Sequence, residues 1–332
     1  MNFEEYCLEP DFERLRTALL CQGEPDHVPF VDPGIYAGHK ARVVGHPMRG
    51  LPDEIEFALR MGYDFVPIKL GLLLTPGIQG AITSEADFEN FEWPDPDGFD
   101  YSVLAEADKI LPPNIKVLFK GKSFSPVWWV IGFEAFCTAL LDSPDLIGRM
   151  FERVGSIQYR VLQRALEHCC VGVYWHGDNV AFSTGLMVSP PVLHQYVFPW
   201  FRRMVQLAHE HGVPAIYHSD GKLDPILEDI IHIGFDGLHS VEPTAMDIVQ
   251  VKKRVEGRLC LLGNIDLRYT LTRGSPEEVD EEVRTRIGEL APGGGYCLSS
   301  SNSIPDYVSF DNYKAMHRAW LKYGKYPIQL DC

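Results

Sequence analysis

Residues 217–221 place a histidine and an aspartate two positions apart, directly after the short apolar run 213–216. Side chains alternate along a strand, so His218 and Asp220 point the same way if this run is a buried strand. Imidazole and carboxylate groups bind metal ions or move protons. The alternative is an aspartate that caps the next helix beside a hydrogen-bonded histidine, and these five residues alone favour neither interpretation.

The elements around this segment predict a (β/α)8 barrel. Seven further apolar runs resemble buried strands: 27–32, 63–70, 115–120, 171–178, 237–242, 259–264 and 295–299. Helical patterns fall between them, and three Ser-Pro pairs mark helix starts at residues 143, 189 and 275, the last with a capping box to Glu278. Eight strands alternating with helices favour a closed barrel over an open doubly wound sheet, and no Rossmann fingerprint or P-loop is present. We expect one domain over residues 1–332.

The active site of such a barrel lies where its strands end. Polar residues follow nearly every predicted strand: Asp32, Lys120, Lys122, His176, Asp178, His218, Asp220, His239, Glu242, Asn264, Asp266, Ser301 and Asn302. Of these, His218, Asp220, Glu242 and Asn302 could bind zinc or another divalent ion. We predict that Asp178, His218 and Glu242 are catalytic. Simpler roles are a helix cap for Asp32 and Asp266 and a structural histidine at position 239.

Composition limits the classes of partner. A net charge of −16 argues against nucleic acid and anionic membranes, and means that an anionic substrate would need a local basic pocket. No run is long enough to span a membrane, and the acidic first residues are unlike a signal peptide, so we expect a cytoplasmic protein. The eight cysteines lack metal-site spacing, and Cys260 and Cys297 are expected in the core.

Three segments carry a family resemblance: His-Ser-Asp-Gly at 218–221, Gly-Asn-Ile-Asp at 263–266, and Gly-Gly-Tyr-Cys-Leu-Ser-Ser-Ser-Asn-Ser-Ile-Pro at 294–305. With them, the chain resembles the uroporphyrinogen decarboxylase superfamily, which also contains corrinoid- and coenzyme M-dependent methyltransferases. True decarboxylases have an arginine-rich segment after the first strand, which binds the substrate's carboxylates. Residues 31–40 contain no arginine, and residues 65–70 lack the family's aspartate, so a tetrapyrrole substrate is not expected.

The methyltransferase branch of this superfamily binds zinc through His-x-Cys and a later Cys. His218 matches the histidine, whereas Asp220 and Asn302 replace the two cysteines. Oxygen ligands would leave a metal more electron-poor and better able to polarise an ether oxygen. The resemblance therefore implies a methyltransferase similar to O-demethylases, which passes a methyl group from a methoxylated aromatic to the corrinoid of a separate partner protein. A homodimer is expected by analogy.

Aromatic and polar residues near the strand ends could bind this substrate. The predicted contacts are Tyr36, Phe124, Trp129, His176 and Asn264. Tyr174 is a further aromatic candidate, whereas core packing is the first expectation for Trp128 and Trp175.

Two other functions remain open. The first is a cofactor-independent decarboxylase, with Asp178 or His218 moving protons and a basic pocket of Lys120, Lys122 and Arg42. The second is a non-catalytic binding protein that has kept the fold.

Overall fold

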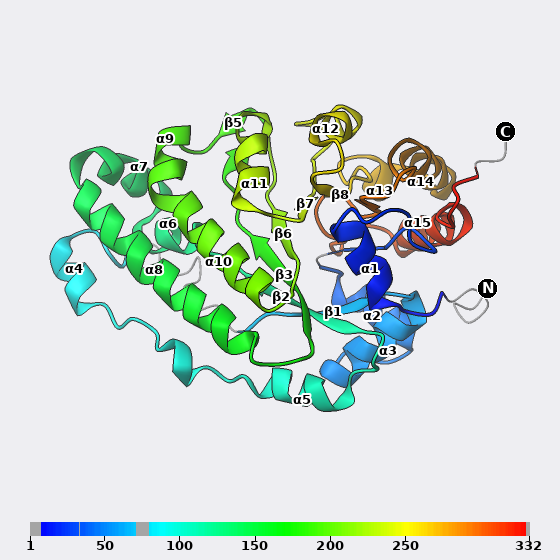
Figure 1. The fold of residues 1–332 in the computed structure, drawn as a ribbon, viewed down its shortest axis with the longest axis horizontal. Coiled ribbons are helices and arrows are strands. Elements are labelled where there is room, and N and C mark those ends of the chain that lie inside the picture. Colours follow the sequence, from blue (N-terminus) through cyan, green and yellow to red (C-terminus); the bar gives the residue numbers. More distant parts are fainter. Residues whose placement is uncertain (1–7, 33, 71–79, 330–332) are drawn as a thin grey trace.

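The computed structural model describes residues 8–32, 34–70 and 80–329. Its centre is a curled, parallel seven-stranded sheet in the order β1-β2-β3-β6-β7-β8-β9 (Figure 1). The strands are β1 (Phe65–Ile68), β2 (Lys116–Gly121), β3 (Val171–Gly177), β6 (Ala215–His218), β7 (Gly237–His239), β8 (Cys260–Leu262) and β9 (Tyr296–Cys297). Each of them lies within or overlaps a predicted strand.

The first predicted strand, 27–32, takes the eighth position beside β9. The Leu298 N–H donates to the Pro29 carbonyl at 2.9 Å, and the Val31 N–H donates to the Leu298 carbonyl at 2.8 Å. Phe30 and Leu298 form a parallel bridge. This segment therefore extends the sheet in the direction needed for a barrel, and the predicted (β/α)8 class is confirmed.

Helices surround the sheet. They are α1 (Phe12–Leu19), α2 (Ala37–Val44), α3 (Leu51–Met61), α4 (Glu85–Asn90), α5 (Ser102–Ile110), α6 (Ser125–Ile131), α7 (Phe133–Asp142), α8 (Pro144–Ala165), α9 (Pro190–Val192), α10 (Phe198–Glu210), α11 (Leu227–Ile233), α12 (Ile248–Val255), α13 (Thr270–Arg273), α14 (Pro276–Leu290) and α15 (Phe310–Tyr323). A π-helix, η4 (Leu193–Val197), joins α9 to α10.

The long helices α8 and α10 pack together along one side of the sheet (Figure 1). A Cβ atom at Gly155 of α8 would lie 2.2 Å from the Trp200 ring of α10, so this close approach requires glycine. The predicted start residues Ser143 and Ser189 are N-caps by position, although neither side chain makes a capping hydrogen bond. The predicted capping box between Ser275 and Glu278 is present.

Several elements were not predicted from the sequence. They are α2, α5 and the hairpin of β4 (Ala181–Phe182) with β5 (Gly185–Leu186). The segment 71–100, expected as a loop, contains α4 and the short 3-10 helix η3 (Pro96–Gly98), while residues 71–79 lie outside the described part.

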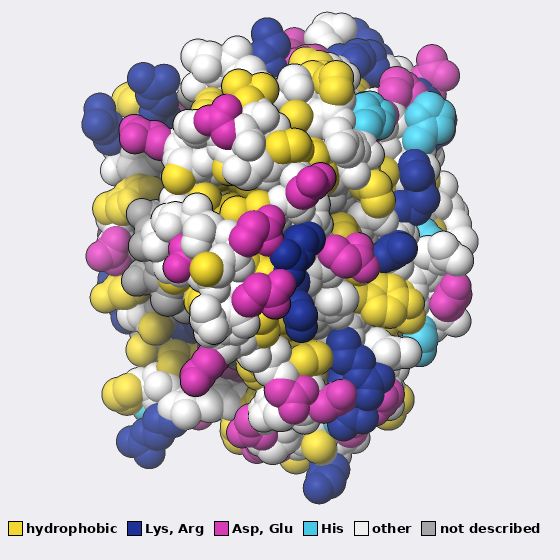
Figure 2. All heavy atoms as spheres, turned by 90° about the vertical axis from the view of Figure 1, so that its left-hand side faces the viewer, with side chains coloured by type: hydrophobic (Ala, Val, Ile, Leu, Met, Phe, Trp, Pro, Cys, Tyr) yellow, Lys and Arg dark blue, Asp and Glu magenta, His cyan; other side chains and the backbone are white. Residues whose placement is uncertain are grey.

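The outer surface over the left side of Figure 1 carries mixed charge. Figure 2 shows basic and acidic side chains interspersed over this face. Ion pairs such as Arg160–Asp97 and Arg164–Glu167 link α8 to its surroundings and its own C-terminal end. Among the described residues, no helix is long and apolar enough to cross a membrane.

Candidate functional site

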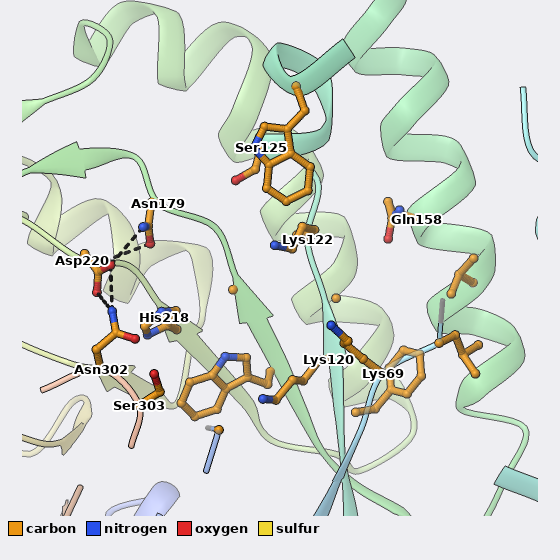
Figure 3. Close-up of a pocket in the computed structure, with 18 of the residues that line it drawn as sticks. Lys69, Lys120, Lys122, Ser125, Gln158, Asn179, His218, Asp220, Asn302 and Ser303 are labelled. Atoms are coloured by element: carbon orange, nitrogen blue, oxygen red, sulfur yellow. Dashed lines mark hydrogen bonds between the residues drawn. The ribbon is translucent and has the colours of Figure 1, made fainter. Parts of the chain in front are cut away.

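A cavity of about 500 Å³ lies at the carboxyl ends of β1, β2, β3 and β6. Figure 3 shows its polar residues in two groups, with Lys69, Lys120 and Lys122 on one side and Asn179, His218, Asp220 and Asn302 on the other. Its walls also include Leu70, Phe99, Phe119, Trp128, Trp129 and Trp175. The cavity is therefore basic at one end, acidic and amide-rich at the other, and lined with aromatic rings.

The basic end is formed by the first two strands of the sheet. Lys69 follows β1, and Lys120 and Lys122 lie two apart at the end of β2, so alternation directs both to the same side. Lys122 Nζ lies 4.5 Å from the centre of the Trp129 ring. Burial and the positive charges of Lys40, Lys69 and Lys122 lower the pKa of Lys120 to about 8. Unlike a surface lysine, Lys120 is therefore partly neutral at mildly alkaline pH.

At the other end, one carboxylate is held by two amides. Asn302 Nδ2 donates to both Asp220 carboxylate oxygens at 2.8 and 2.9 Å, and Asn179 Nδ2 donates at 3.1 Å. The Asp220 N–H donates to Asn179 Oδ1 at 3.1 Å, which fixes the pair. Burial raises the pKa of Asp220, and the nearby Glu242 charge adds to this effect. The predicted grouping of His218, Asp220 and Asn302 at one end of the cavity is present.

A hydrogen-bonded chain leads from His218 into the protein. His218 and His239 are register partners in β6 and β7, and their Nδ1 atoms lie 2.7 Å apart. His239 Nε2 lies 2.9 Å from Ser299 Oγ, and Ser299 Oγ donates to Asp32 Oδ1 at 3.3 Å. The chain therefore connects the cavity to a buried carboxyl group through three side chains.

The two ends of this chain have strongly shifted pKa values. Burial, with the positive charges of Lys120 and Lys122, lowers the pKa of His218 to about 3, so its imidazole is neutral. Burial raises the pKa of Asp32 to about 6 against the effect of the hydrogen bonds from Ser300. Among the described residues Asp32 Oδ2 has no close hydrogen-bond partner, although the nearby Tyr63 hydroxyl also acts to lower the Asp32 pKa.

Asp178, predicted to be catalytic, is buried outside the cavity lining. Its carboxylate accepts backbone N–H groups from Ser123, Phe124 and Ser125, and lies 3.1 Å from His176 Nε2. Burial opposes its ionisation, but the bonds and charges of its neighbours prevail and lower its pKa to about 2. In this structure Asp178 anchors the start of α6, and a stably ionised, enclosed carboxylate is poorly suited to act as a base.

Glu242, predicted as a catalytic group and metal ligand, lies beside this cavity rather than in it. Its carboxylate accepts the Gly221 N–H at 3.2 Å and the Thr244 hydroxyl at 2.5 Å. It lines a smaller neighbouring cavity, which shares Asp220 and Asn302 with the larger one.

The predicted metal ligands do not fit a zinc site as they are arranged. Within the described part of the chain, the only group of three His, Cys, Asp or Glu residues with ligand atoms within 4.8 Å of one another is His46, Asp53 and Glu56. This group contains none of the predicted ligands. The Asp220 oxygens already accept hydrogen bonds from Asn302 and Asn179, and the Glu242 carboxylate accepts the Gly221 N–H, whereas His218 is bonded through Nδ1 alone. A tetrahedral ion needs four donors that converge on one point.

Of the predicted substrate contacts, Trp129 lines the cavity. Phe124, His176 and Asn264 are buried in packing outside it, and Tyr36 is an exposed residue at the start of α2. Tyr174 is likewise fully buried. Trp128 and Trp175, for which core packing was expected first, both contribute to the cavity wall.

Some lining residues were missed from the sequence. Lys69, Ser125, Gln158, Asn179 and Ser303 line the cavity without having been proposed as contacts. Lys69 carried a usable signal, because it lies near the end of the predicted strand 63–70 and directly follows β1. Asn179 lies two residues after the end of β3. It was overlooked because the preceding His-Gly-Asp segment offered more obvious candidates for the site.

Comparisons with known proteins identify the family of this chain. The model of the family "Uroporphyrinogen decarboxylase (URO-D)" matches residues 58–323. Methylcobamide:CoM methyltransferase MtaA of Methanosarcina barkeri is 31% identical over 146 residues, which are 42% of this chain and 40% of that relative. Uroporphyrinogen decarboxylase of Chlorobaculum tepidum is 22% identical over 78% of this chain and 74% of its own length.

A solved structure agrees on the fold. A methyltransferase from Methanosarcina mazei has a TM-score of 0.71 and 19% identity, covering 95% of this chain and 99% of that one. At this identity the likeness establishes architecture and leaves the reaction open. Because the family model covers most of the chain, from α3 to the last helix, the protein belongs to the uroporphyrinogen decarboxylase (URO-D) family.

Proposed function

We propose that this protein is a methyltransferase that takes a methyl group from a methoxylated aromatic compound and passes it to a corrinoid carried by a separate partner protein. One observation carries the proposal: His218 faces an aromatic-walled cavity at the end of a hydrogen-bonded chain that leads to a buried carboxyl group. The methyltransferase of Methanosarcina barkeri, which is similar over part of the chain, supports the same class of reaction.

The reaction needs a proton at one defined place. As the methyl–oxygen bond breaks, the oxygen keeps the electron pair and becomes a phenolate, which leaves more readily if it is protonated. The corrinoid, when its carrier docks, supplies the electron pair that forms the new bond to the methyl carbon. The residues of this chain hold the aromatic ring, exclude water and deliver the proton.

We assign proton delivery to His218 Nε2. In one tautomeric arrangement Asp32 is protonated on Oδ1, and the Ser299 hydroxyl turns from Asp32 to donate to His239 Nε2. His239 Nδ1–H then donates to His218 Nδ1, and His218 carries its proton on Nε2. Transfer of that proton to the phenolate draws one proton along each link, and the last comes from protonated Asp32. One proton leaves Asp32, one reaches the product oxygen, and both histidines stay neutral throughout.

Asp220 has a different role in this mechanism. Hydrogen bonds from the Nδ2 atoms of Asn179 and Asn302 fix its carboxylate at the cavity wall. A fixed carboxylate can accept a hydrogen bond from a ring hydroxyl, and so orient the substrate beside His218.

No step is routed through a metal ion. Of the predicted ligand set of His218, Asp220, Glu242 and Asn302, the carboxylates of Asp220 and Glu242 would have to give up their hydrogen bonds to bind zinc or another divalent ion, whereas His218 could keep its bond to His239. Glu242 keeps a structural task instead, because it holds the Gly221 backbone and so the turn that carries Asp220.

The test is conversion of a methoxybenzoate to its phenol by the purified protein with reduced cobalamin as methyl acceptor. We expect phenol formation by the parent and a loss of roughly a hundredfold or more in His218→Ala, because one positioned proton donor contributes about that much. Lys253→Gln, a change on the exposed surface of α12, is the control. Phenol formation that is equal in parent and His218→Ala would remove His218 from the mechanism.

A second candidate is a decarboxylase, favoured by the lysine-lined end of the cavity. Loss of CO2 leaves a carbanion that also needs a proton, and the same chain could supply it. The two reactions differ in product: carbon dioxide without cobalt dependence indicates decarboxylation, whereas phenol formed only with reduced cobalamin indicates methyl transfer.

A further inference from the structure

We infer that Lys69, Lys120 and Lys122 form a binding site for an anionic ring substituent, so that the substrate is a methoxylated aromatic carboxylate. The inference rests on the proposed function for the methoxy group, whereas the anion site stands on the lysines themselves. The anion site would fix the orientation of the substrate, with its carboxylate at the basic end of the cavity and its methoxy oxygen at the His218 end (Figure 3).

The three lysines form no close ion pair. Among the described residues, none of their ammonium groups has a carboxylate within 4.0 Å, whereas the neighbouring Lys40 is paired with Glu54 at 2.7 Å. Positive charges gathered in a partly buried cavity repel one another and are poorly hydrated. Glu54 and Asp178 act on Lys120 and Lys122 only from a longer distance. Three ammonium groups gathered without a close carboxylate are suited to a ligand that brings the negative charge.

The charge of the whole chain makes this local arrangement necessary. At a net charge of −16, the protein repels anions at long range. Salt screens that repulsion beyond about 10 Å, whereas contacts inside a cavity are screened much less. A local group of lysines is therefore what allows an acidic small molecule to bind here.

The aromatic wall selects a flat ligand. Lys122 lies over the Trp129 ring, so an anion that meets this ammonium group also meets the indole face. Trp128 packs edge-on against Trp129, with ring centres 5.8 Å apart, and its buried N–H has no acceptor among the described residues. A ring with a carboxylate would supply both an apolar face and an acceptor, which an aliphatic anion would not.

The inference is tested by direct binding, without any corrinoid. Calorimetry would compare 4-methoxybenzoate with methoxybenzene, which has the same ring and ether but no charge, on the parent protein. The same titrations would be made on Lys120→Gln, Lys122→Gln and Lys69→Gln, with Lys253→Gln as the surface control. Removing one charge from a repelling group should not unfold the protein, and circular dichroism checks that it does not.

We expect the parent to bind the benzoate at least tenfold more tightly than methoxybenzene. Lys120→Gln and Lys122→Gln, which are half-buried, should each lose about tenfold in benzoate affinity, and the exposed Lys69→Gln should lose less. Methoxybenzene affinity should not change in any variant. Equal affinity for the two ligands, or benzoate affinity unchanged in all three variants, would overturn the inference.

These results are separable from the proposed function. Lysine-dependent benzoate binding without methyl transfer would keep the anion site and reject the methyltransferase. Methyl transfer from methoxybenzene at the rate seen with the benzoate would keep the methyltransferase and reject the anion site.

Discussion

Replacing Asp178 by asparagine tests whether this residue stabilises the fold or takes part in catalysis. Asp178 is fully buried, accepts three backbone N–H groups at the start of α6 and contacts His176. Asparagine has nearly the same shape, but it has no charge and presents an NH2 group where an acceptor is needed. At least one of the backbone donors is therefore left facing another donor, inside a region that water does not reach.

The magnitude follows from the pKa and from this lost bond. The shift of the Asp178 pKa to about 2 corresponds to roughly 2 to 3 kcal/mol in favour of the folded protein at neutral pH. An unsatisfied buried donor adds about 1 to 3 kcal/mol, so Asp178→Asn should lose roughly 3 to 6 kcal/mol of unfolding free energy. Urea denaturation measures this loss.

The pH dependence has a definite sign. A carboxyl group whose pKa is lowered on folding stabilises the protein above its unfolded pKa, and this stabilisation is lost as the pH falls through the folded value. The difference between parent and variant should therefore be constant from about pH 5 to pH 8, and should begin to shrink below about pH 4. Asp220→Asn is the matched control, since its half-buried carboxylate lies in the cavity, and we expect a loss below about 1 kcal/mol. A normally stable but inactive Asp178→Asn would refute the anchor role and restore Asp178 as a catalytic residue.

Three further predictions concern the proton chain and the metal. A carboxyl group whose pKa is raised on folding loses its stabilising contribution as the pH rises through its folded value, here about 6. The stability of Asp32→Asn relative to the parent should therefore increase by roughly 2 kcal/mol from about pH 4 to pH 7, as measured by urea denaturation. A difference in stability that does not change with pH would contradict the raised pKa of Asp32. Ser299→Ala removes the hydroxyl between His239 and Asp32. Phenol formation should therefore fall about tenfold or more, while the KM for the methoxybenzoate stays the same. A change in KM alone would assign Ser299 to substrate binding. A chelator should leave the rate of methyl transfer unchanged. If elemental analysis found one zinc ion per chain in the parent and none in Asp220→Ala, the metal-free mechanism would be contradicted.

The sequence predicted the barrel and one half of its cavity for a physical reason. Strands in a parallel barrel all end at the same edge, so residues far apart in sequence meet there. Asp220 and Asn302, 82 positions apart, are hydrogen-bonded as that rule implies. The eight apolar runs were sufficient for this inference because each has the length of one buried strand.

The same rule was wrong about which side chains of β3 face the cavity. Trp175 and Gly177 line it, whereas His176 and Asp178 point the other way, and His176 packs 4.2 Å from the Phe201 ring of α10. Residues 171–176 are buried on both faces, so their hydrophobicity does not alternate and gives no indication of direction. Only the register with neighbouring strands settles it.

Long-range contacts explain the remaining differences. Asp32 was expected to cap a helix, but it accepts hydrogen bonds from Ser300, 268 positions away, and α2 starts at another residue. Arg42 was expected in the basic pocket, whereas its guanidinium lies 3.9 Å over the Phe310 ring. Asp266 does bond the turn at 268–269, as a local capping interaction that local sequence can predict.

The central claim is that this chain moves a methyl group from an aromatic ether to cobalt, with His218 as proton donor. The most direct test is a single-turnover mixture of the protein, reduced cobalamin and 4-methoxybenzoate, followed by the cobalt absorption spectrum. We predict conversion of reduced to methylated cobalamin with the parent protein, matched by formation of the phenol, and little conversion with His218→Ala. An unchanged cobalt spectrum, accompanied by release of carbon dioxide from the benzoate, would contradict the methyltransferase and identify a decarboxylase.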